Sequence, residues 1–569
     1  MQTIAWGLFR VENNGMRPWV FLAVVTLPIA AFAAAYPGHP ATTPDINAKD
    51  ISARDKALAD DAFRGRGPGT AAGEAAAQWV ADEMKRIGLK PGNHGSWFQN
   101  VPAVSITLDP AQSHLTFNTK AGALTPKFPD ETVYWTPLYD KKTVDVANLP
   151  LVFVGYGVVA PEYHWNDYAG LDVHGKAVVI LVNDPGNEDA HPDPNFFKGH
   201  AMTYYGRWTY KYEEAARQGA AAAIIVHETV PAAYGWQVLR SSDSGSLLWL
   251  QNRDKNKSMV PVEAWITLDT AKDLFKRAGL DYEAEKRAAN LRGFHGVPMA
   301  GESLGAHLVS KFSELTTRNV IGVLPGTRHP NDYFLYTAHW DHLGVKPDVP
   351  GADKIHNGAL DNAMGVASIL EIAEAFAHGK PPQRSVAFLS WTLEEQGLLG
   401  SQYFAAHPLW PLGHIVGGVN LDGGLPEGHA RDLVLIGNGA SELEDHLTPI
   451  LKSQGRTIAP DPEPEKGSFY RSDHISLAKV GVPMLDPSGG YDLVKGGKKA
   501  GQAVRDDYRL HLYHQPSDEW RADWDLTGVV DDMNALYRLG DKLADGNDWP
   551  NWHPGNEFRA IRDKQKPGS

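Results

Sequence analysis

The sequence predicts an α/β protein with a mixed, mostly parallel sheet that is flanked by helices and interrupted by a β-rich insertion. From residue 317 onward, short apolar runs alternate with helical patterns, an order typical of parallel strands whose connecting helices cover both faces of a sheet. From residue 106 to about residue 308, short β-rich runs instead lie among Gly, Asp and Pro turns. We therefore expect one α/β domain with a second module inserted into it.

The length of 569 residues also predicts more than one domain, because single cores stop growing at about 250–300 residues. The expected division is a signal peptide at residues 1–35, a linker at 36–48, the first part of the α/β domain at 49–105, the insertion at 106–312, the second part of the α/β domain at 313–545, and a peripheral polar tail at 546–569.

An uncharged, largely apolar run occupies residues 19–35 and follows Arg10 and Arg17. A basic start, an apolar centre and small residues at the end are typical of a signal peptide. The sequence therefore predicts an exported protein, periplasmic or secreted, with no stable membrane insertion after cleavage. Because the run is close to the shortest length that spans a bilayer, an uncleaved N-terminal anchor is the alternative.

The composition restricts the possible chemistry. A net charge of −14 argues against a nucleic-acid partner, whose binding requires clustered Lys and Arg. The chain contains no cysteine, which excludes disulfides, cysteine-bound zinc and thiol catalysis. Any metal must therefore be bound by His, Asp and Glu, and a peptide substrate stays possible. The oligomeric state is left open.

The apolar periodicity indicates the individual elements. Residues 73–87 carry apolar side chains at helical spacing, and Gly88 can end this helix in a left-handed cap. The same reasoning predicts further elements after residue 317: strands at 333–337, 385–391, 415–421 and 482–485, and a helix at 363–377. In the insertion it predicts strands at 151–154, 177–182 and 223–226, and one helix near 210–218.

Potential metal ligands follow three of the predicted strands. In chain order these residues are His339 and Asp341, then Glu394 and Glu395, then Asp422. Because the carboxyl ends of parallel strands meet at one edge of a sheet, where ligands bind, we expect these side chains to converge. Two further candidates are Asp361, at the start of the helix 363–377, and His514.

Each candidate taken alone has a simpler explanation. Asp361 could be an N-cap, the adjacent glutamates could begin a helix, Asp422 could belong to a turn, and His514 could be a hydrogen-bonded histidine. However, five potential zinc ligands among these residues, all at strand or helix ends, are more than chance would place there. Together they predict a metal site.

Five stretches resemble the M28 family of metallopeptidases, the zinc aminopeptidase and glutamate carboxypeptidase group, and they occur in the order of that family. These stretches are residues 338–344, 358–363, 393–401, 420–422 and 513–514. The resemblance covers residue 49 to about 100 and 317 to about 545, and it implies the zinc exopeptidase fold. The insertion resembles the protease-associated (PA) domain in residues 154–158 and 215–226.

The resemblance implies a site for two Zn²⁺ ions. His339 and Asp422 would bind one ion, Glu395 and His514 would bind the other, and Asp361 would bridge both. The peptide bond that follows the bridging aspartate is often cis in this family.

The resemblance also implies the catalytic groups. Glu394 would be the general base and acid, and Asp341 would orient the imidazole of His339. Tyr470 would assist the oxyanion, although Phe469 is an alternative in the register and a packed aromatic is the simpler explanation.

The implied function is an exported dinuclear zinc exopeptidase, most simply an aminopeptidase, that hydrolyses peptide bonds at chain ends by metal-activated water with a Glu general base. A glutamate-carboxypeptidase-like enzyme is an alternative that needs arginines near the substrate carboxylate, and Arg471 is the one arginine placed near the motifs. A glutaminyl cyclase, which uses one zinc, and a non-catalytic receptor-like protein are disfavoured by the complete ligand set with Glu394.

Overall fold

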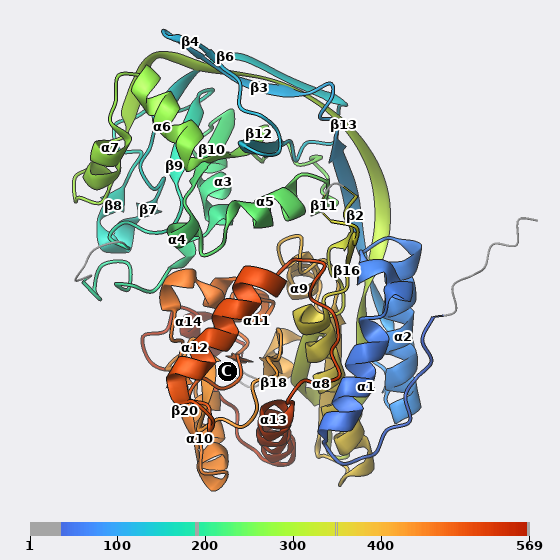
Figure 1. Ribbon diagram of the computed structural model, residues 1–569. Coiled ribbons are helices and arrows are strands. Elements are labelled where there is room, and N and C mark those ends of the chain that lie inside the picture. The colour runs from blue at the N-terminus through green and yellow to red at the C-terminus, as the bar shows by residue number, and fades with distance from the viewer. Residues whose placement is uncertain (1–35, 188–192, 348, 350, 566–569) are drawn as a thin grey trace, which may run out of the picture. The chain divides into compact units, whose positions relative to one another are not determined.

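The computed structural model describes residues 36–187, 193–347, 349 and 351–565 (Figure 1). The predicted signal peptide, residues 1–35, lies outside the described residues. Across the described ranges, none of the helices combines the length and the apolar character that crossing a membrane requires.

The α/β part is built on a mixed sheet. Its central strand β14 (His329–His339) pairs in parallel with β17 (Arg384–Trp391) on one side and with β18 (Ile415–Asn420) on the other. Strand β18 pairs in parallel with β21 (Met484–Pro487), whereas β13 (Val297–Leu324) runs antiparallel to β17. The predicted mixed, mostly parallel sheet is confirmed.

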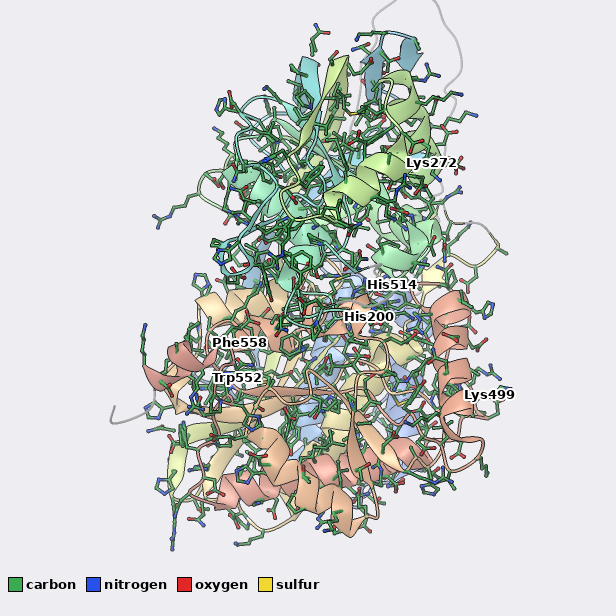
Figure 2. All side chains as sticks on the ribbon, turned by 90° about the vertical axis from the view of Figure 1, so that its left-hand side faces the viewer. His200, Lys272, Lys499, His514, Trp552 and Phe558 are labelled. Atoms are coloured by element: carbon green, nitrogen blue, oxygen red, sulfur yellow. The ribbon has the colours of Figure 1, made fainter. Side chains whose placement is uncertain are left out.

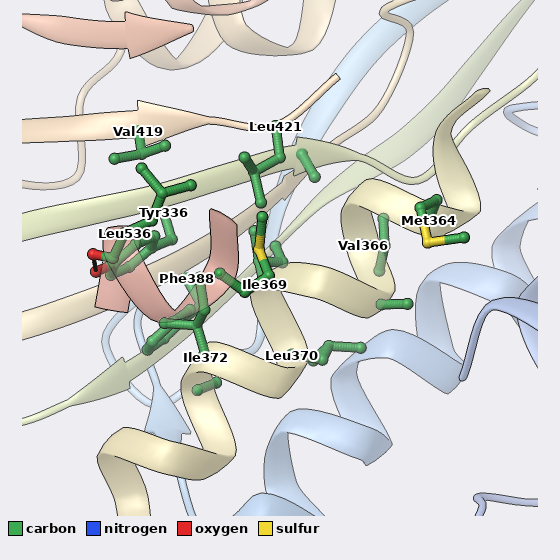
Figure 3. Packing of buried hydrophobic residues seen from close by; sticks show 14 of the residues in the cluster. Tyr336, Met364, Val366, Ile369, Leu370, Ile372, Phe388, Val419, Leu421 and Leu536 are labelled. Atoms are coloured by element: carbon green, nitrogen blue, oxygen red, sulfur yellow. Dashed lines mark hydrogen bonds between the residues drawn. The ribbon is translucent and has the colours of Figure 1, made fainter. Parts of the chain in front are cut away.

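Apolar side chains cover both faces of this sheet. Along β14, Tyr336 belongs to the apolar cluster on one face and its neighbour Leu335 to the cluster on the other. Helix α8 (Met364–His378) packs on the Tyr336 face, where Figure 3 shows Ile369 close to Phe388. Because burying one such side chain contributes about 1.5–3 kcal/mol, this packing holds the strand ends in place.

The predicted helices of the α/β part are confirmed. Helix α2 (Ala71–Ile87) begins where the Thr70 side chain accepts a hydrogen bond from the N–H of Gly73, and it ends at Gly88 in the left-handed conformation (φ 104°). The other helices of this part are α1 (Ala48–Leu58), α9 (Leu399–Ala406), α10 (Leu443–Ser453), α11 (His474–Ala478), α12 (Gly497–Asp507), α13 (Thr527–Asp545) and α14 (Arg559–Asp563).

The β-rich part has its own parallel core. Strands β6 (Thr143–Phe153), β9 (Ala177–Leu181), β10 (Ala222–His227) and β12 (Val262–Thr267) pair in that order and in parallel. The prediction of one helix was wrong, because the part contains α3 (Trp208–Arg217), α4 (Thr229–Ala232), α5 (Trp236–Asp243), α6 (Leu268–Arg277) and α7 (Tyr282–Ala289). Three of the missed helices, α4, α5 and α7, have eight residues or fewer, which is too short for a clear period.

One long strand connects the two parts of the molecule. The first half of β13 pairs with β6 and with β3 (His114–Thr119), and its second half pairs with β2 (Phe98–Leu108) and β17 (Figure 1). The predicted limits of the insertion, residues 106 and 312, therefore lie inside strands. The division into domains stays a prediction.

The segment after residue 546 is not peripheral as far as the structure describes it. Trp552 is fully buried and its indole N–H donates to the carbonyl of Gly481 (3.0 Å). Figure 2 shows Phe558 next to it, with 5.2 Å between the ring centroids. The prediction of a peripheral tail was wrong because the three aromatic residues of this polar segment, Trp549, Trp552 and Phe558, follow no helical or strand period.

Candidate metal centre

The candidate ligands converge at the carboxyl edge of the mixed sheet. They come from the end of β14 (His339), the segment η4 (Ala359–Ala363) that precedes α8 (Asp361), the loop after β17 (Glu394 and Glu395), the loop after β18 (Asp422), and the turn that follows η8 (Tyr508–Leu512) (His514). The Asp361–Asn362 peptide bond is cis, which confirms that expectation.

Asp361 lies between the two histidines. One of its carboxylate oxygens is 3.3 Å from Nε2 of His339, and the other is 3.4 Å from Nε2 of His514. Nε2 of His339 is also 3.3 Å from Asp422, and Nε2 of His514 is 3.0 Å from Glu395. Each imidazole therefore faces Asp361 and one further carboxylate, which is the arrangement expected for a bridged pair of cations.

The charges of this cluster depend on one another. Burial opposes a proton on His514, but the carboxylates of Glu395 and Asp361 raise its pKa to about 10. Burial would raise the pKa of Glu395, yet the imidazoles of His514 and His342 lower it to about 2. The carboxylates of the cluster thus favour positive charge beside them. Protonated imidazoles supply this charge here, and metal cations supply it when they replace the protons.

The donor atoms fit zinc. Candidate ligand atoms of His339, Asp361 and Glu395 lie within 4.8 Å of one another, and so do those of His339, Glu394 and Asp422. Carboxylate oxygen and imidazole nitrogen are the zinc ligands that remain in a chain without cysteine.

Glu394 lies beside these candidate ligands, in the wall of a cleft that the α/β part and the β-rich part both line. One carboxylate oxygen is 3.8 Å from Nε2 of His339, and the side chain is 11% exposed. Burial raises the pKa of Glu394 well above its usual range; His339 opposes this shift, whereas Asp422 and Glu395 add to it. A carboxyl group with a raised pKa can hold and release a proton near neutral pH.

Asp341 is placed differently from the prediction. The main-chain carbonyl of Asp341 lies 3.1 Å from Nδ1 of His339, whereas its carboxylate is 3.9 Å away. That carboxylate instead accepts a hydrogen bond from the main-chain N–H of Glu394 (3.2 Å). Asp341 therefore positions the loop that carries Glu394 as well as the ring of His339.

Comparison with known proteins adds to this geometry. The sequence profile of Peptidase family M28 matches residues 319–537. We call these matched residues, 319–537, the M28 part of the chain. The chain is 40% identical over 91 residues to a probable zinc metalloprotease of Pyrenophora teres f. teres (strain 0-1), a stretch that covers 15% of this chain and 18% of that protein.

A longer match is to leucine aminopeptidase 2 of Trichophyton equinum, at 27% identity over 248 residues, with 41% of this chain and 46% of that protein covered. The chain thus spans less than half the length of these relatives. The solved aminopeptidase from Aneurinibacillus sp. strain AM-1 has a TM-score of 0.51 and 20% identity, over 90% of this chain and 95% of that one. This likeness shows the fold, which extends beyond the M28 part.

Two tyrosines near the candidate metal ligands differ in their surroundings. Tyr470 lines the cleft, but its ring packs in an apolar cluster with Trp552 and Phe558. Tyr513 stacks on the ligand His514, with 3.9 Å between the ring centroids, and lines the cleft next to Glu394. Tyr513 therefore contacts a candidate ligand directly, and its signal in the sequence was its position directly before His514. The role of Tyr470 stays a prediction.

Sequence reasoning missed two residues that hold the loop of Asp361. The carboxylate of Asp518 accepts hydrogen bonds from the main-chain N–H groups of Leu360 (2.9 Å) and Asp361 (3.0 Å). The guanidinium of Arg66 donates to the carbonyls of Trp340 (2.8 Å) and Gly358 (2.8 Å). Asp518 follows His514 by four residues, a possible signal, whereas no pattern marks Arg66.

A third missed residue, His342, donates a hydrogen bond from Nδ1 to the carboxylate of Glu395. Its signal was available, because His342 lies within the M28-like stretch 338–344. This contact fixes the orientation of Glu395 toward His514, as partners of metal-binding groups commonly do.

The M28 part and the β-rich part both line the cleft at the ligands. The cleft has a volume of about 430 Å³, and its walls include Glu394 and His514 from the M28 part and Arg207 and Ser242 from the β-rich part. Oγ of Ser242, in α5, lies 3.4 Å from Nδ1 of His514. The β-rich part thus supplies side chains to the surroundings of the metal ligands.

Proposed function

We propose that this protein is a zinc exopeptidase, and more narrowly an aminopeptidase that removes residues from the N-terminal end of peptides. The observation that carries this proposal is Asp361, whose two carboxylate oxygens face His339 and His514 separately. Glu394 and Asp361 both line a second cavity, which shares Glu394 and His514 with the cleft. The family match and the names of the relatives, a probable zinc metalloprotease and a leucine aminopeptidase, support the same reaction class.

The ligand geometry supports two zinc ions for each chain. His339 and Asp422 would hold one ion and Glu395 and His514 the other, with Asp361 shared between them. When bound, such a pair supplies an activated water and stabilises the negative charge that develops on the carbonyl oxygen.

Glu394 is proposed as the group that moves the proton. It would take a proton from the attacking water and deliver it to the departing amine, a role that contributes about 10²–10⁴ in rate. Its raised pKa and its place at the cleft suit this role. Asp341 would keep Glu394 in position through the main-chain hydrogen bond. We assign assistance to the oxyanion to Tyr513 instead of Tyr470, because Tyr513 stacks on His514.

Two expectations rest on the sequence. The insertion at residues 106–312 is proposed to be a PA domain, supported by its resemblance in residues 154–158 and 215–226. Export to the periplasm or secretion is proposed from the signal-peptide-like residues 1–35.

A glutamate-carboxypeptidase-like activity is the second candidate. One observation favours it: the cleft contains Arg207 in addition to the expected Arg471, and arginines recognise carboxylates. The glutaminyl cyclase and receptor alternatives gain no comparable support, because the five ligands and Glu394 lie together.

Hydrolysis assays with the zinc-loaded protein separate these candidates. The substrates are aminoacyl p-nitroanilides, free dipeptides, and dipeptides whose amino group is acetylated, each with and without a chelator. An aminopeptidase cleaves the substrates with a free amine, loses activity with the chelator, and leaves the acetylated dipeptides intact. Cleavage of acetylated dipeptides instead supports the carboxypeptidase, and no cleavage of any substrate refutes the proposal.

A further inference from the structure

A largely apolar cavity of about 500 Å³ adjoins the cleft, and we call it the aromatic cavity. It shares Trp208, Ser242, Glu395 and Gly397 with the wall of the cleft. Because Glu395 is a candidate metal ligand, the aromatic cavity begins beside the metal centre, and a peptide bound there can continue into it. The apolar walls of the aromatic cavity consist of Trp135, Trp208, Tyr212, Leu247, Trp249 and Met259.

The β-rich part supplies the aromatic residues of this cavity. Trp135 ends β5 (Thr132–Trp135), Trp208 and Tyr212 lie in α3, and Trp249 lies in β11 (Ser246–Leu250). Strand β5 pairs with β12, and β11 pairs with β2. The aromatic side chains are therefore carried by a helix and by paired strands, which hold a binding site more precisely than loops do.

The aromatic rings hold one another in fixed positions. The ring centroids of Trp135 and Tyr212 are 5.8 Å apart and those of Trp208 and Tyr212 are 6.0 Å apart, both edge to face. The indole N–H of Trp135 donates to Glu263 (2.8 Å), and the hydroxyl of Tyr212 donates to the carbonyl of Ala264 (2.9 Å). Because these polar ends are already bonded, Trp135 and Tyr212 offer mainly apolar surface to a ligand.

Several polar side chains in the wall of the aromatic cavity are neutral or already have partners. Burial raises the pKa of Glu263 to about 8, so this carboxyl group is mostly neutral at pH 7. Nε of Arg217 donates to Glu214 (2.8 Å). The side-chain carbonyl of Gln396 accepts a hydrogen bond from the main-chain N–H of Leu248 (3.0 Å). The aromatic cavity thus suits an apolar group better than a charged one.

The candidate metal ligands also line a smaller cavity, with a volume of about 230 Å³. Its walls include Asp361, Asp422 and Tyr508, all from the M28 part. The smaller cavity suits the single residue that an aminopeptidase removes, which leaves the cleft to the residues after the cleaved bond. From the cleft, these residues reach the aromatic cavity.

We propose that the aromatic cavity binds an aromatic or large aliphatic side chain of the substrate that lies after the cleaved bond. The inference rests on the proposed aminopeptidase function and narrows its substrates to peptides that carry such a side chain within a few residues of that bond. The volume of about 500 Å³ lies within the range of ~300–1,000 Å³ that is usual for ligand sites. Aromatic side chains bury a large apolar area and gain favourable ring contacts in such surroundings.

Four tetrapeptide amides with the same N-terminal residue X test the inference on the zinc-loaded full chain. The parent is X-Ala-Ala-Ala-NH₂, and each of the other three has one of its alanines replaced by phenylalanine. The C-terminal amide is common to all four, so only one side chain differs. We expect kcat/KM for release of X from at least one Phe peptide to exceed that for the parent by about 10- to 100-fold, the range for burying one large apolar side chain.

Two variants connect this preference to the aromatic cavity. Ala216 and Trp249 line the aromatic cavity, and within the described ranges they do not line the cleft. Ala216→Trp should fill the aromatic cavity and bring the ratio of kcat/KM for the Phe peptide to that for the parent close to one. Trp249→Ala removes part of the aromatic wall and should lower the same ratio.

Ala284→Trp is the matched control, because Ala284 is an exposed alanine on α7 of the same β-rich part. This variant should retain the full ratio of the wild type. Because a folding defect would lower the rates for the Phe peptide and the parent alike, a change in the ratio reports binding of the side chain.

Equal kcat/KM for all four peptides in the wild-type enzyme overturns the inference and leaves the peptidase function intact. A preference for Phe that persists in both Ala216→Trp and Trp249→Ala also overturns it, because the side chain would then bind elsewhere. Absence of hydrolysis of all four peptides contradicts the proposed function itself, which is a different outcome.

Discussion

Two buried glutamates of this molecule, Glu395 in the M28 part and Glu263 in the β-rich part, lie in opposite electrostatic surroundings. In the M28 part, Glu395 faces the imidazoles of His514 and His342, which overcome burial and lower its pKa to about 2. In the β-rich part, Glu263 accepts a hydrogen bond from the indole N–H of Trp135 (2.8 Å), and burial raises its pKa to about 8. Burial alone therefore favours the neutral carboxyl group, and cationic neighbours are needed to keep it ionised and able to bind metal.

Arginines of the molecule also differ in how their charge is satisfied. Arg66, next to the ligand loops, is surrounded by main-chain carbonyls. Arg207, from the β-rich part, is not satisfied in this way by the described residues. Unpartnered guanidinium nitrogens occur in both parts, since Nε of Arg384 and of Arg456 in the M28 part also lacks a hydrogen-bond partner. Arg207 differs in its place, because it lines the cleft that contains Glu394 and His514.

The largest effect is expected at Glu394, a buried carboxyl group of the M28 part that is proposed to move a proton instead of binding metal. Glu394→Gln should lower kcat by about 10²–10⁴, because the amide cannot accept the proton of the attacking water. Its zinc content should equal that of the wild type. Steady-state kinetics and metal analysis of the same preparation measure both quantities.

Glu395→Gln is the matched comparison for this variant. Glu395 is proposed to bind zinc and lies 3.0 Å from His514, so this change should reduce both zinc content and activity. The difference between adjacent glutamates separates proton transfer from metal binding. An active, zinc-replete Glu394→Gln enzyme would contradict the role of Glu394.

The next largest effect is expected at Glu263, whose protonation should make stability depend on pH. Its pKa is about 8 in the folded protein and 4.5 ordinarily, so between these values the folded state binds more protons than the unfolded state. Stability should then fall as pH rises through this window, by up to about 1.4 kcal/mol per unit. Glu263→Gln removes this titration. Between pH 5 and pH 8, its free energy of unfolding should therefore rise by about 3 kcal/mol relative to that of the wild type.

Denaturant unfolding of both proteins at pH 5, 6.5 and 8 measures this difference. Glu314→Gln is the control, because Glu314 is an exposed glutamate that pairs with Lys255 on the surface. A difference in stability between Glu263→Gln and wild type that stays constant across these pH values would show that Glu263 is not neutral in the folded protein.

Sequence reasoning succeeded where the chain repeats a local pattern. Strands β14, β17, β18 and β21 and helix α8 were predicted from their apolar patterns. His339, Glu395 and Asp422 were found because each follows one of the predicted strands. The candidate ligands were therefore identified before any distance was known, and the distances brought them together.

Contacts between distant segments could not be predicted in the same way. Arg66 reaches the carbonyl of Gly358 across 292 positions of the chain, and Arg207 reaches the cleft only because the β-rich part folds next to it. The indole N–H of the buried Trp552 likewise finds its hydrogen-bond acceptor at the carbonyl of Gly481, 71 positions away. Such partners are set by tertiary packing, which leaves no period in the local sequence.

The smallest effect is expected at Asp518, a buried carboxyl group whose pKa lies between those of Glu395 and Glu263. Burial raises its pKa to about 6, while the N–H groups of Leu360 and Asp361 and the imidazole of His342 oppose the shift. In Asp518→Asn, one side-chain atom that accepts a hydrogen bond becomes an NH₂ group facing an N–H. Because this loosens the loop of Asp361, we expect a loss of about 10- to 100-fold in zinc affinity or kcat/KM.

Zinc titration and kinetics at saturating zinc distinguish the two routes by which Asp518→Asn could act. Recovery of the rate with added zinc means that the loop mainly serves metal affinity, whereas a persistent deficit means that it also aligns the reacting groups. Asp523→Asn is the matched control, since Asp523 pairs with Arg521 on the surface. Wild-type zinc affinity and rate in Asp518→Asn would show that Asp361 keeps its position without these hydrogen bonds, leaving the ligands themselves to determine the geometry of the site.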